Sequence, residues 1–161
     1  MAAKKRVAKK PPAKGRRKVR SGQRKDLNDV FFRSGWEANV ARILNHKKIK
    51  WDYERDIYVF HGLTRGKVAY TPDFWVTKVP RKEEYKAMKD IIIEVKGRMN
   101  SGDYTKLLNF KKQYPGDFAR LRGIVRKNSK AHKSFDRLGI PILWFYDDLV
   151  KSYSHIIKEW E

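Results

Sequence analysis

The sequence has no cysteine, no long apolar run and no acidic residue in its first 25 positions. Without cysteine there is neither a disulfide framework nor a thiolate zinc site, so any metal would be held by carboxylates or histidines. No apolar run approaches the roughly 18–20 residues that cross a bilayer, and the basic N-terminus lacks the apolar segment of a signal peptide. We therefore expect a soluble, intracellular protein without a membrane partner.

Basic residues are in large excess. The chain carries 39 Lys and Arg against 18 Asp and Glu, a formal charge of +21. Residues 1–25 hold 12 of the basic residues, which leaves +9 on residues 26–161. The low-complexity first segment predicts a disordered basic arm over 1–25, with a targeting signal as the alternative, followed by one folded domain over 26–161. A domain that stays positive without its arm favours a nucleic acid partner.

The hydrophobic pattern predicts an α/β fold, a mixed central β-sheet flanked by helices. Helices are expected at about 34–46, from Tyr104 to near Pro115, at 130–139, and over the last segment, where Leu149, Tyr153, Ile156 and Trp160 recur at helical spacing. Strands are expected at 49–60, 68–79, 91–97, 119–125 and 140–146. Residues 80–90 are predicted to be a polar excursion between two strands.

The strand predicted at 91–97, IIIEVKG, combines branched apolar residues with a charged pair. Alternation along a strand places Glu94 and Lys96 side by side on one face, while the Val95 side chain points away and its carbonyl offers an oxygen ligand. Charged groups in a sheet interior are costly unless they are paired or bind a cation. A surface ion pair is the alternative interpretation of this pattern.

Two further carboxylates are candidates for the same site: Glu37 on the first predicted helix and Asp73 in a Pro-Asp pair. Each has a local structural explanation, because Ser34 and Glu37 fit a capping box and a Pro-Asp pair often forms a turn. Carboxylates can hold Mg²⁺, which generates hydroxide near neutral pH, and a nearby lysine can polarise a phosphate. On a basic domain the combination favours phosphodiester hydrolysis.

These motifs resemble the PD-(D/E)XK nuclease superfamily, with Pro72-Asp73 as the first element and Glu94-Val95-Lys96 as the second. Longer blocks are similar to the Holliday-junction-resolving endonuclease I of T-odd bacteriophages, and the resemblance covers nearly all of residues 31–145. The blocks are FRSGWEANVARIL at 32–44, IKWDYE at 49–54, YTPDF at 70–74, IIIEVKG at 91–97, FKKQYPGDFARLRGIV at 110–125 and LGIPI at 138–142.

The resemblance implies a restriction-endonuclease-like core and a homodimeric, metal-dependent endonuclease. Such an enzyme would cut branched DNA such as four-way junctions, leave 5′-phosphate and 3′-hydroxyl ends, and act in the host cytoplasm if phage-encoded. One or two Mg²⁺ or Mn²⁺ ions per active site are implied, with Lys96 as the catalytic lysine. The implied carboxylate ligands are Glu37, Asp73 and Glu94, and strand geometry adds the Val95 carbonyl as a further ligand.

Four basic residues are expected to contact phosphates: Arg33, Lys47 and Lys48 near the first helix, and Arg98 just past the catalytic strand. None of the four histidines has ligand-like spacing, so none is assigned to the metal.

Relative to the resembled family, residues 80–90 look like an insertion. Residues 57–70 contain a plausible hairpin turn where that family's dimer exchanges a bridging strand. Two alternatives remain open. One is another PD-(D/E)XK nuclease of the homing, restriction, transposase-associated or repair-nicking kind, and the other is a DNA-binding protein with a degenerate site.

Overall fold

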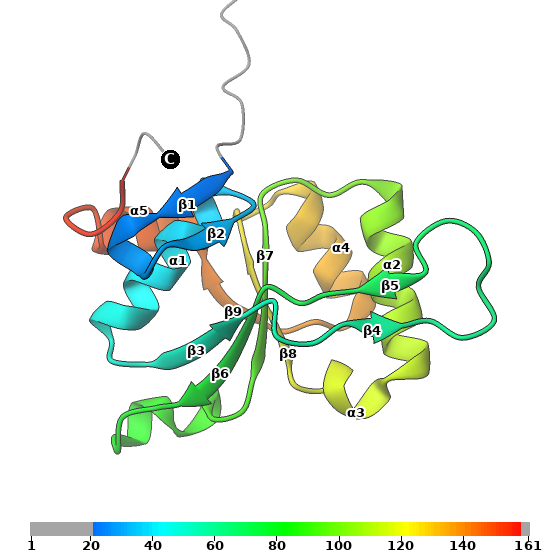
Figure 1. Cartoon of the computed structure of the whole chain (residues 1–161), viewed down its shortest axis with the longest axis horizontal. Coiled ribbons are helices and arrows are strands. Elements are labelled where there is room, and N and C mark those ends of the chain that lie inside the picture. The colour runs from blue at the N-terminus through cyan, green and yellow to red at the C-terminus, as the bar shows by residue number, and fades with distance from the viewer. Residues whose placement is uncertain (1–20, 159–161) are drawn as a thin grey trace, which may run out of the picture.

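A five-stranded mixed sheet forms the centre of the fold (Figure 1). The computed structural model describes residues 21–158. The strand order is β3-β6-β7-β8-β9, in which β3, β6 and β7 pair antiparallel while β7, β8 and β9 run parallel. The five strands are β3 (Lys50–Tyr53), β6 (Phe74–Lys78), β7 (Ile92–Lys96), β8 (Leu121–Val125) and β9 (Ile142–Phe145). This arrangement confirms the predicted mixed α/β architecture.

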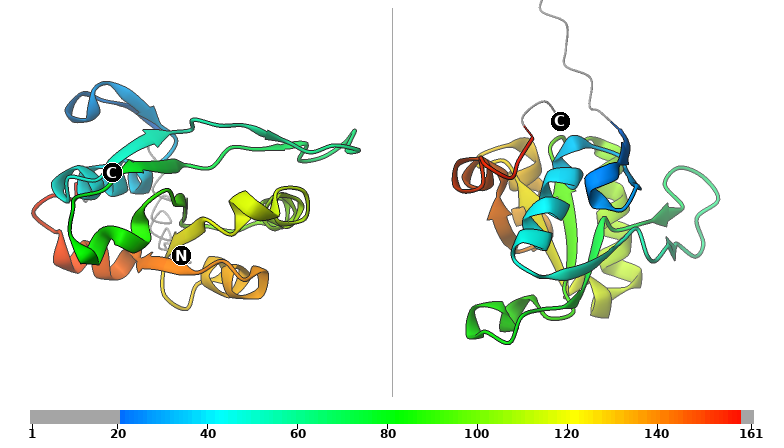
Figure 2. Two further views of the ribbon diagram at one scale, coloured as in Figure 1. Left: turned by 90° about the horizontal axis from the view of Figure 1, so that it is seen from below. Right: turned by 60° about the vertical axis from the view of Figure 1, so that its left-hand side comes forward.

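Helices cover both faces of the sheet, each with its own apolar cluster (Figures 1 and 2). α1 (Gly35–His46) and α5 (Tyr146–Ser152) pack on one face, and α2 (Ser101–Gln113) and α4 (Lys130–Leu138) pack on the other. No helix in residues 21–158 is long and apolar enough to cross a membrane.

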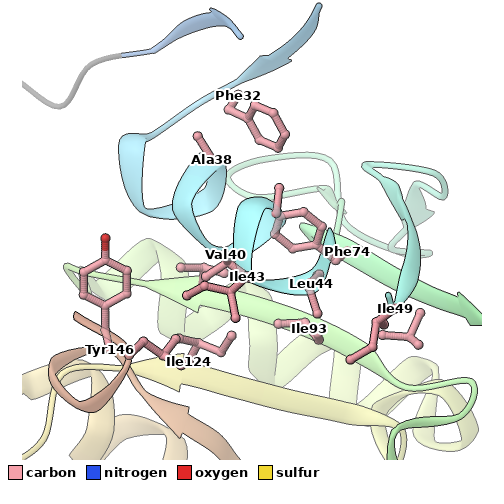
Figure 3. Packing of buried hydrophobic residues seen from close by; sticks show 14 of the residues in the cluster. Phe32, Ala38, Val40, Ile43, Leu44, Ile49, Phe74, Ile93, Ile124 and Tyr146 are labelled. Atoms are coloured by element: carbon pink, nitrogen blue, oxygen red, sulfur yellow. The ribbon is translucent and has the colours of Figure 1, made fainter. Parts of the chain in front are cut away.

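The central strand β7 alternates as predicted. Ile93 lies among Val40, Ile43 and Leu44 of α1 in the cluster drawn in Figure 3. Ile92 belongs to the cluster beneath α2 and α4. Both isoleucines are fully buried. Covered faces on both sides explain why this strand reads as a nearly continuous apolar run.

The strands predicted at 49–60 and 68–79 are wrong in extent, because each is interrupted. β3 ends before Glu54, which has a left-handed φ of 48° and donates its N–H to the carbonyl of Asp73 at 3.0 Å. On the second segment, Pro72 has no N–H to give to a ladder. The outer pieces, β4 (Tyr58–Val59) and β5 (Ala69–Tyr70), pair with each other as a separate two-stranded hairpin.

The β4–β5 hairpin and its loop extend away from the five-stranded sheet (Figure 2). Four of the five exposed large apolar side chains of the described residues belong to residues 57–68. They are Ile57, Val59, Leu63 and Val68, and Ile57 has 69% of its surface exposed.

Folded structure begins earlier than predicted. β1 (Gly22–Arg24), the short 3₁₀ helix η1 (Lys25–Leu27) and β2 (Val30–Phe32) form a small unit on α1, although no structure was predicted for residues 1–25. Asp26 accepts from the buried Arg42 at 2.7 Å, and this hydrogen bond lowers the pKa of Asp26 to about 2. Residues 1–20 of the predicted arm lie outside the described residues.

The structure differs from the predicted elements in three smaller ways, at η2, α3 and the end of α5. The excursion at 80–90 contains a 3₁₀ helix, η2 (Glu83–Met88), and a short helix, α3 (Pro115–Phe118), follows α2 directly. α5 ends at Ser152, so the predicted helical spacing continues beyond the helix itself, and Trp160 lies outside the described residues. α4 ends at Gly139 as predicted, with φ at 79°.

Gly123 on β8 lets α4 approach the sheet. A Cβ at this position would lie 2.3 Å from the Phe135 ring. We predict that Gly123→Ala destabilises the protein by about 1–3 kcal/mol, the usual cost of overpacking a core. Chemical denaturation would measure the change. Gly116→Ala is the matched control, since its Cβ would meet nothing within 4 Å, and equal unfolding free energies for the two variants would contradict the packing argument.

Candidate active site

Asp73, Glu94 and Lys96 meet where β6 and β7 separate. Asp73 directly precedes β6, whose ladder with β7 runs through Phe74 and Ile93. The backbone N–H of Val95 is thereby left to donate to Oδ2 of Asp73 at 2.7 Å. The Lys96 ammonium lies 3.2 Å from Oε1 of Glu94, which is only 2% exposed. The surface-pair interpretation of Glu94 and Lys96 is therefore wrong.

Glu37 approaches from the first turn of α1. Ser34 caps the helix by accepting the N–H of Glu37 at 3.2 Å, and its hydroxyl donates to Oε1 of Glu37 at 2.7 Å. The N–H of Arg33 donates to Oε2 at 3.0 Å. Only the Ser34 half of the predicted capping box is therefore present, because Glu37, which is itself buried, accepts from the N–H of Arg33 and not from that of Ser34.

A tyrosine hydroxyl contacts each of the two glutamates. Tyr53 at the end of β3 donates to Oε2 of Glu37 at 2.5 Å, and Tyr70 at the end of β5 donates to Oε2 of Glu94 at 2.7 Å. Burial, followed by the charges of Glu94 and Asp73, raises the pKa of Tyr70. Burial and the bond to Glu37 raise the pKa of Tyr53. Both phenols therefore remain protonated donors at neutral pH.

The buried carboxylates repel one another, whereas the charge of Lys96 is stabilised by the carboxylates around it. Burial, followed by the charges of Glu94 and Glu37, raises the pKa of Asp73 well above its usual range. Burial acts to lower the pKa of Lys96, but Glu94, Asp73 and Asp103 outweigh it and raise that pKa. The lysine therefore stays charged, while the two buried carboxylates favour an additional cation or a proton between them.

The donor chemistry at this position suits a hard divalent cation. Carboxylate and carbonyl oxygens are the ligands that Mg²⁺ and Mn²⁺ accept. Within residues 21–158, no three Asp, Glu or His side chains are already gathered around a single ion position. Asp73 and Glu94 lie together at the buried end of β7, whereas Glu37 lies on α1 and accepts from Arg33, Ser34 and Tyr53.

The indole of Trp36 links α1 to β7. A Cβ on Gly97, the residue after Lys96, would lie 3.3 Å from this ring. The indole also contacts Tyr146, at the start of α5, whose ring stacks on it with centroids 3.8 Å apart. The guanidinium of Arg126 lies 5.5 Å from the same indole. Trp36 thereby ties the position of its neighbour Glu37 to β7 and to α5.

The four predicted phosphate contacts divide into two groups. Arg33 and Arg98 are exposed next to the site, and Arg33 pairs with Glu54 at 2.6 Å. Lys47 and Lys48 lie at the opposite end of α1, whose 12 residues span about 18 Å. The Lys47 ammonium also lies over the Tyr153 ring at 5.2 Å, so it is a packed rather than a freely extended cation.

Four residues of the site were missed by the sequence analysis: Tyr53, Tyr70, Asp103 and Arg126. Asp103 lies 3.4 Å from the Lys96 ammonium and closes a capping box at the start of α2. The Asn-x-x-Asp spacing that ends at Asp103 could have revealed the helix start. The two tyrosines and Arg126 carry no local signal of their own, since only the fold brings them to the site.

Crowding of buried carboxylates gives a testable effect on stability. A raised pKa of Asp73 means that the folded state loses stability as pH rises through that pKa. We predict that Asp73→Asn raises the melting temperature in EDTA at pH 8, by about 2–4 °C for about 1 kcal/mol of relief. Near pH 4 the gain shrinks. Calorimetry with the exposed Asp148→Asn as control checks this, and a lower melting temperature for Asp73→Asn at pH 8 would contradict it.

Comparison with known proteins matches this chain to one family. A family model for phage endonuclease I matches residues 19–136. No curated protein and no solved structure gives a significant match. The matched segment spans the N-terminal unit, α1 and the strands through β8, including the predicted catalytic residues Glu37, Asp73, Glu94 and Lys96. A match over more than half of the sequence shows that this chain belongs to the phage endonuclease I family.

Proposed function

We propose that this endonuclease is metal-dependent and cleaves branched DNA of the four-way-junction type, leaving 5′-phosphate and 3′-hydroxyl ends. The observation that carries the proposal is the buried pair Asp73 and Glu94 with Lys96 beside it, in a chain of this family. Burying two carboxylates near each other costs stability that a purely structural site would avoid. A bound cation would offset this cost, and together with Lys96 it would attract the phosphate of a DNA strand.

Asp73 and Glu94 would bind Mg²⁺ or Mn²⁺ directly. Val95 supports the assignment, because N–H and C=O of one strand residue point to the same side and its N–H faces Asp73. Glu37, already engaged by three donors, would join through bound water or a second ion. A divalent ion at this position supplies an activated water and offsets the charge that develops on the phosphoryl oxygens.

Lys96 would act on the scissile phosphate. Its ammonium is held between Glu94 and Asp103, at 3.2 and 3.4 Å, and its raised pKa keeps it charged. A fixed cation next to the reacting group stabilises the transition state without reorganisation. Lys96 therefore takes the role of the electrostatic stabiliser, and the carboxylates hold the ion.

The DNA strand would leave the site along the edge where β7 and β8 end. These strands are parallel with Lys96 opposite Val125, so Arg98 and Arg126 emerge from the sheet at the same edge. Arg126 pairs with Asp147 at 3.1 Å and lies over Trp36, which presets its position. Contacts of this kind read backbone geometry rather than base sequence, as recognition of a branch requires.

A homodimer would supply the two active sites that paired cuts need. The β4–β5 hairpin is the surface that we assign to it, because it carries most of the exposed large apolar side chains of residues 21–158 and projects from the body (Figure 2). Exposed apolar groups concentrated on one element indicate an interaction surface.

We predict metal-dependent paired nicks near the branch of an immobile four-way junction, with little cutting of the matching linear duplex. Glu94→Gln and Lys96→Ala should each lower the cleavage rate at least about 100-fold, the typical cost of losing one transition-state contact. Both should retain most of their junction affinity in EDTA. Denaturing gels measure the cleavage, with the exposed Glu84→Gln and Lys151→Ala as charge-matched controls.

Each other result has a defined meaning. Retained cleavage in both variants would refute the catalytic assignment. Equal cutting of duplex and junction would indicate a nuclease of another kind within the superfamily. Tight junction binding without any cut by the wild type would indicate a DNA-binding protein with a degenerate site.

We also predict that Ile57→Glu combined with Val68→Glu converts a dimer into a monomer of 19.1 kDa. Charges on the hairpin would be unfavourable to bury between two copies. Light scattering after gel filtration measures the mass. Phe31→Glu is the control, since Phe31 is 55% exposed but lies on β2 rather than on the hairpin. A wild-type protein that is already monomeric would refute the dimer.

A further inference from the structure

The hydroxyl of Tyr70 has no part in the roles given to the carboxylates and the lysine, yet it contacts one of them. We propose that Tyr70 is a positioning residue of the cleavage site, whose hydroxyl fixes the orientation of the Glu94 carboxylate for metal binding. This inference rests on the proposed function, since it concerns the same site. The contact is the 2.7 Å bond from the Tyr70 hydroxyl to Oε2 of Glu94.

Tyr70 is held firmly enough to act as a reference point. It is 1% exposed and is one of the largest fully buried side chains of the described residues. Its ring lies 4.7 Å from that of Phe110 on α2 and 6.4 Å from that of Tyr58 on β4, measured between centroids. The Lys106 ammonium lies 5.2 Å from its centroid. Packing from α2 and β4 leaves the ring little freedom, so the hydroxyl has a defined position.

The two oxygens of Glu94 have different partners. Oε2 accepts from Tyr70, and Oε1 faces the Lys96 ammonium at 3.2 Å. A carboxylate that is held at both oxygens cannot rotate about its terminal bond without losing one contact. The phenol is a neutral donor, so it orients the carboxylate without cancelling the negative charge that a cation needs. Partners of this kind commonly orient the ligands of metal sites.

Glu37 provides the contrast within the same site. Its Oε2 accepts from Tyr53 and also from the N–H of Arg33, and its Oε1 accepts from Ser34. Loss of the Tyr53 hydroxyl would leave two donors on Glu37. Loss of the Tyr70 hydroxyl would leave Oε2 of a buried carboxylate without that donor, which costs more than removing one bond among several. Tyr70 is therefore the more informative residue to change.

A purely structural role is the competing explanation, because Tyr70 belongs to the aromatic cluster under α2. Tyr58 separates the two explanations. Its ring packs in the same cluster, and burial together with the nearby Asp117 carboxylate raises the pKa of its hydroxyl. Tyr58→Phe and Tyr70→Phe thus remove the same group from the same cluster, but only Tyr70→Phe removes a contact to Glu94.

The test is Mn²⁺ binding to the full chain without DNA, measured by titration calorimetry. Tyr70→Phe should weaken Mn²⁺ binding by about 10- to 100-fold, the usual effect of losing an outer partner of a metal ligand. Tyr58→Phe should bind Mn²⁺ like the wild type. Junction affinity in EDTA should be the same for all three proteins. Cleavage by Tyr70→Phe should recover when the Mn²⁺ concentration is raised by the factor lost in affinity.

The outcomes separate this inference from the proposed function. Wild-type affinity in Tyr70→Phe, or an equal loss in Tyr58→Phe, overturns the positioning role and leaves the nuclease proposal intact. A Tyr70→Phe protein that does not fold overturns it as well, because the hydroxyl would then be structural. A wild-type protein that neither binds Mn²⁺ nor cuts DNA overturns both proposals.

Discussion

Two carboxylates held close together out of water are the constraint around which the site is arranged. Asp73 and Glu94 would repel each other if both were ionised, and burial makes that repulsion stronger. Each surrounding donor offsets part of this cost: the Val95 N–H for Asp73, and Tyr70 and Lys96 for Glu94. These donors come from β5 and β7, so the stability of the two strands and the chemistry of the site depend on the same contacts.

Breaks in the strands serve the site as much as the strands do. The chain leaves the main sheet after Tyr53, where Glu54 turns back to bond the carbonyl of Asp73. It rejoins the sheet after Pro72. This pair of breaks brings Tyr53 and Asp73 to one place and sends the intervening residues outward as the β4–β5 hairpin (Figure 1). The same two breaks therefore position residues of the site and create a projecting apolar surface.

The sequence patterns predicted correctly those features that depend on interactions between neighbouring residues. The alternation in β7, the Ser34 cap of α1 and the Gly139 end of α4 are properties of a few neighbouring residues, and the structure has all three. The strand breaks were missed because β-branched and aromatic residues continue through them. Tyr70 and Arg126 were missed because their roles arise from contacts with Glu94 and Trp36, distant in sequence, which no spacing encodes.

The stacking of Trp36 on Tyr146 joins a residue inside the family match to a residue outside it. The family match ends at residue 136, yet the ring against which Trp36 rests belongs to the first residue of α5. Trp36 adjoins Glu37 in sequence and lies against Gly97 next to Lys96. The C-terminal segment therefore supports the indole through which α1 contacts the end of β7. A chain shortened to residues 19–136 would keep every proposed catalytic side chain. It would lose the ring that supports Trp36, and with it the contact that fixes Glu37 relative to Lys96.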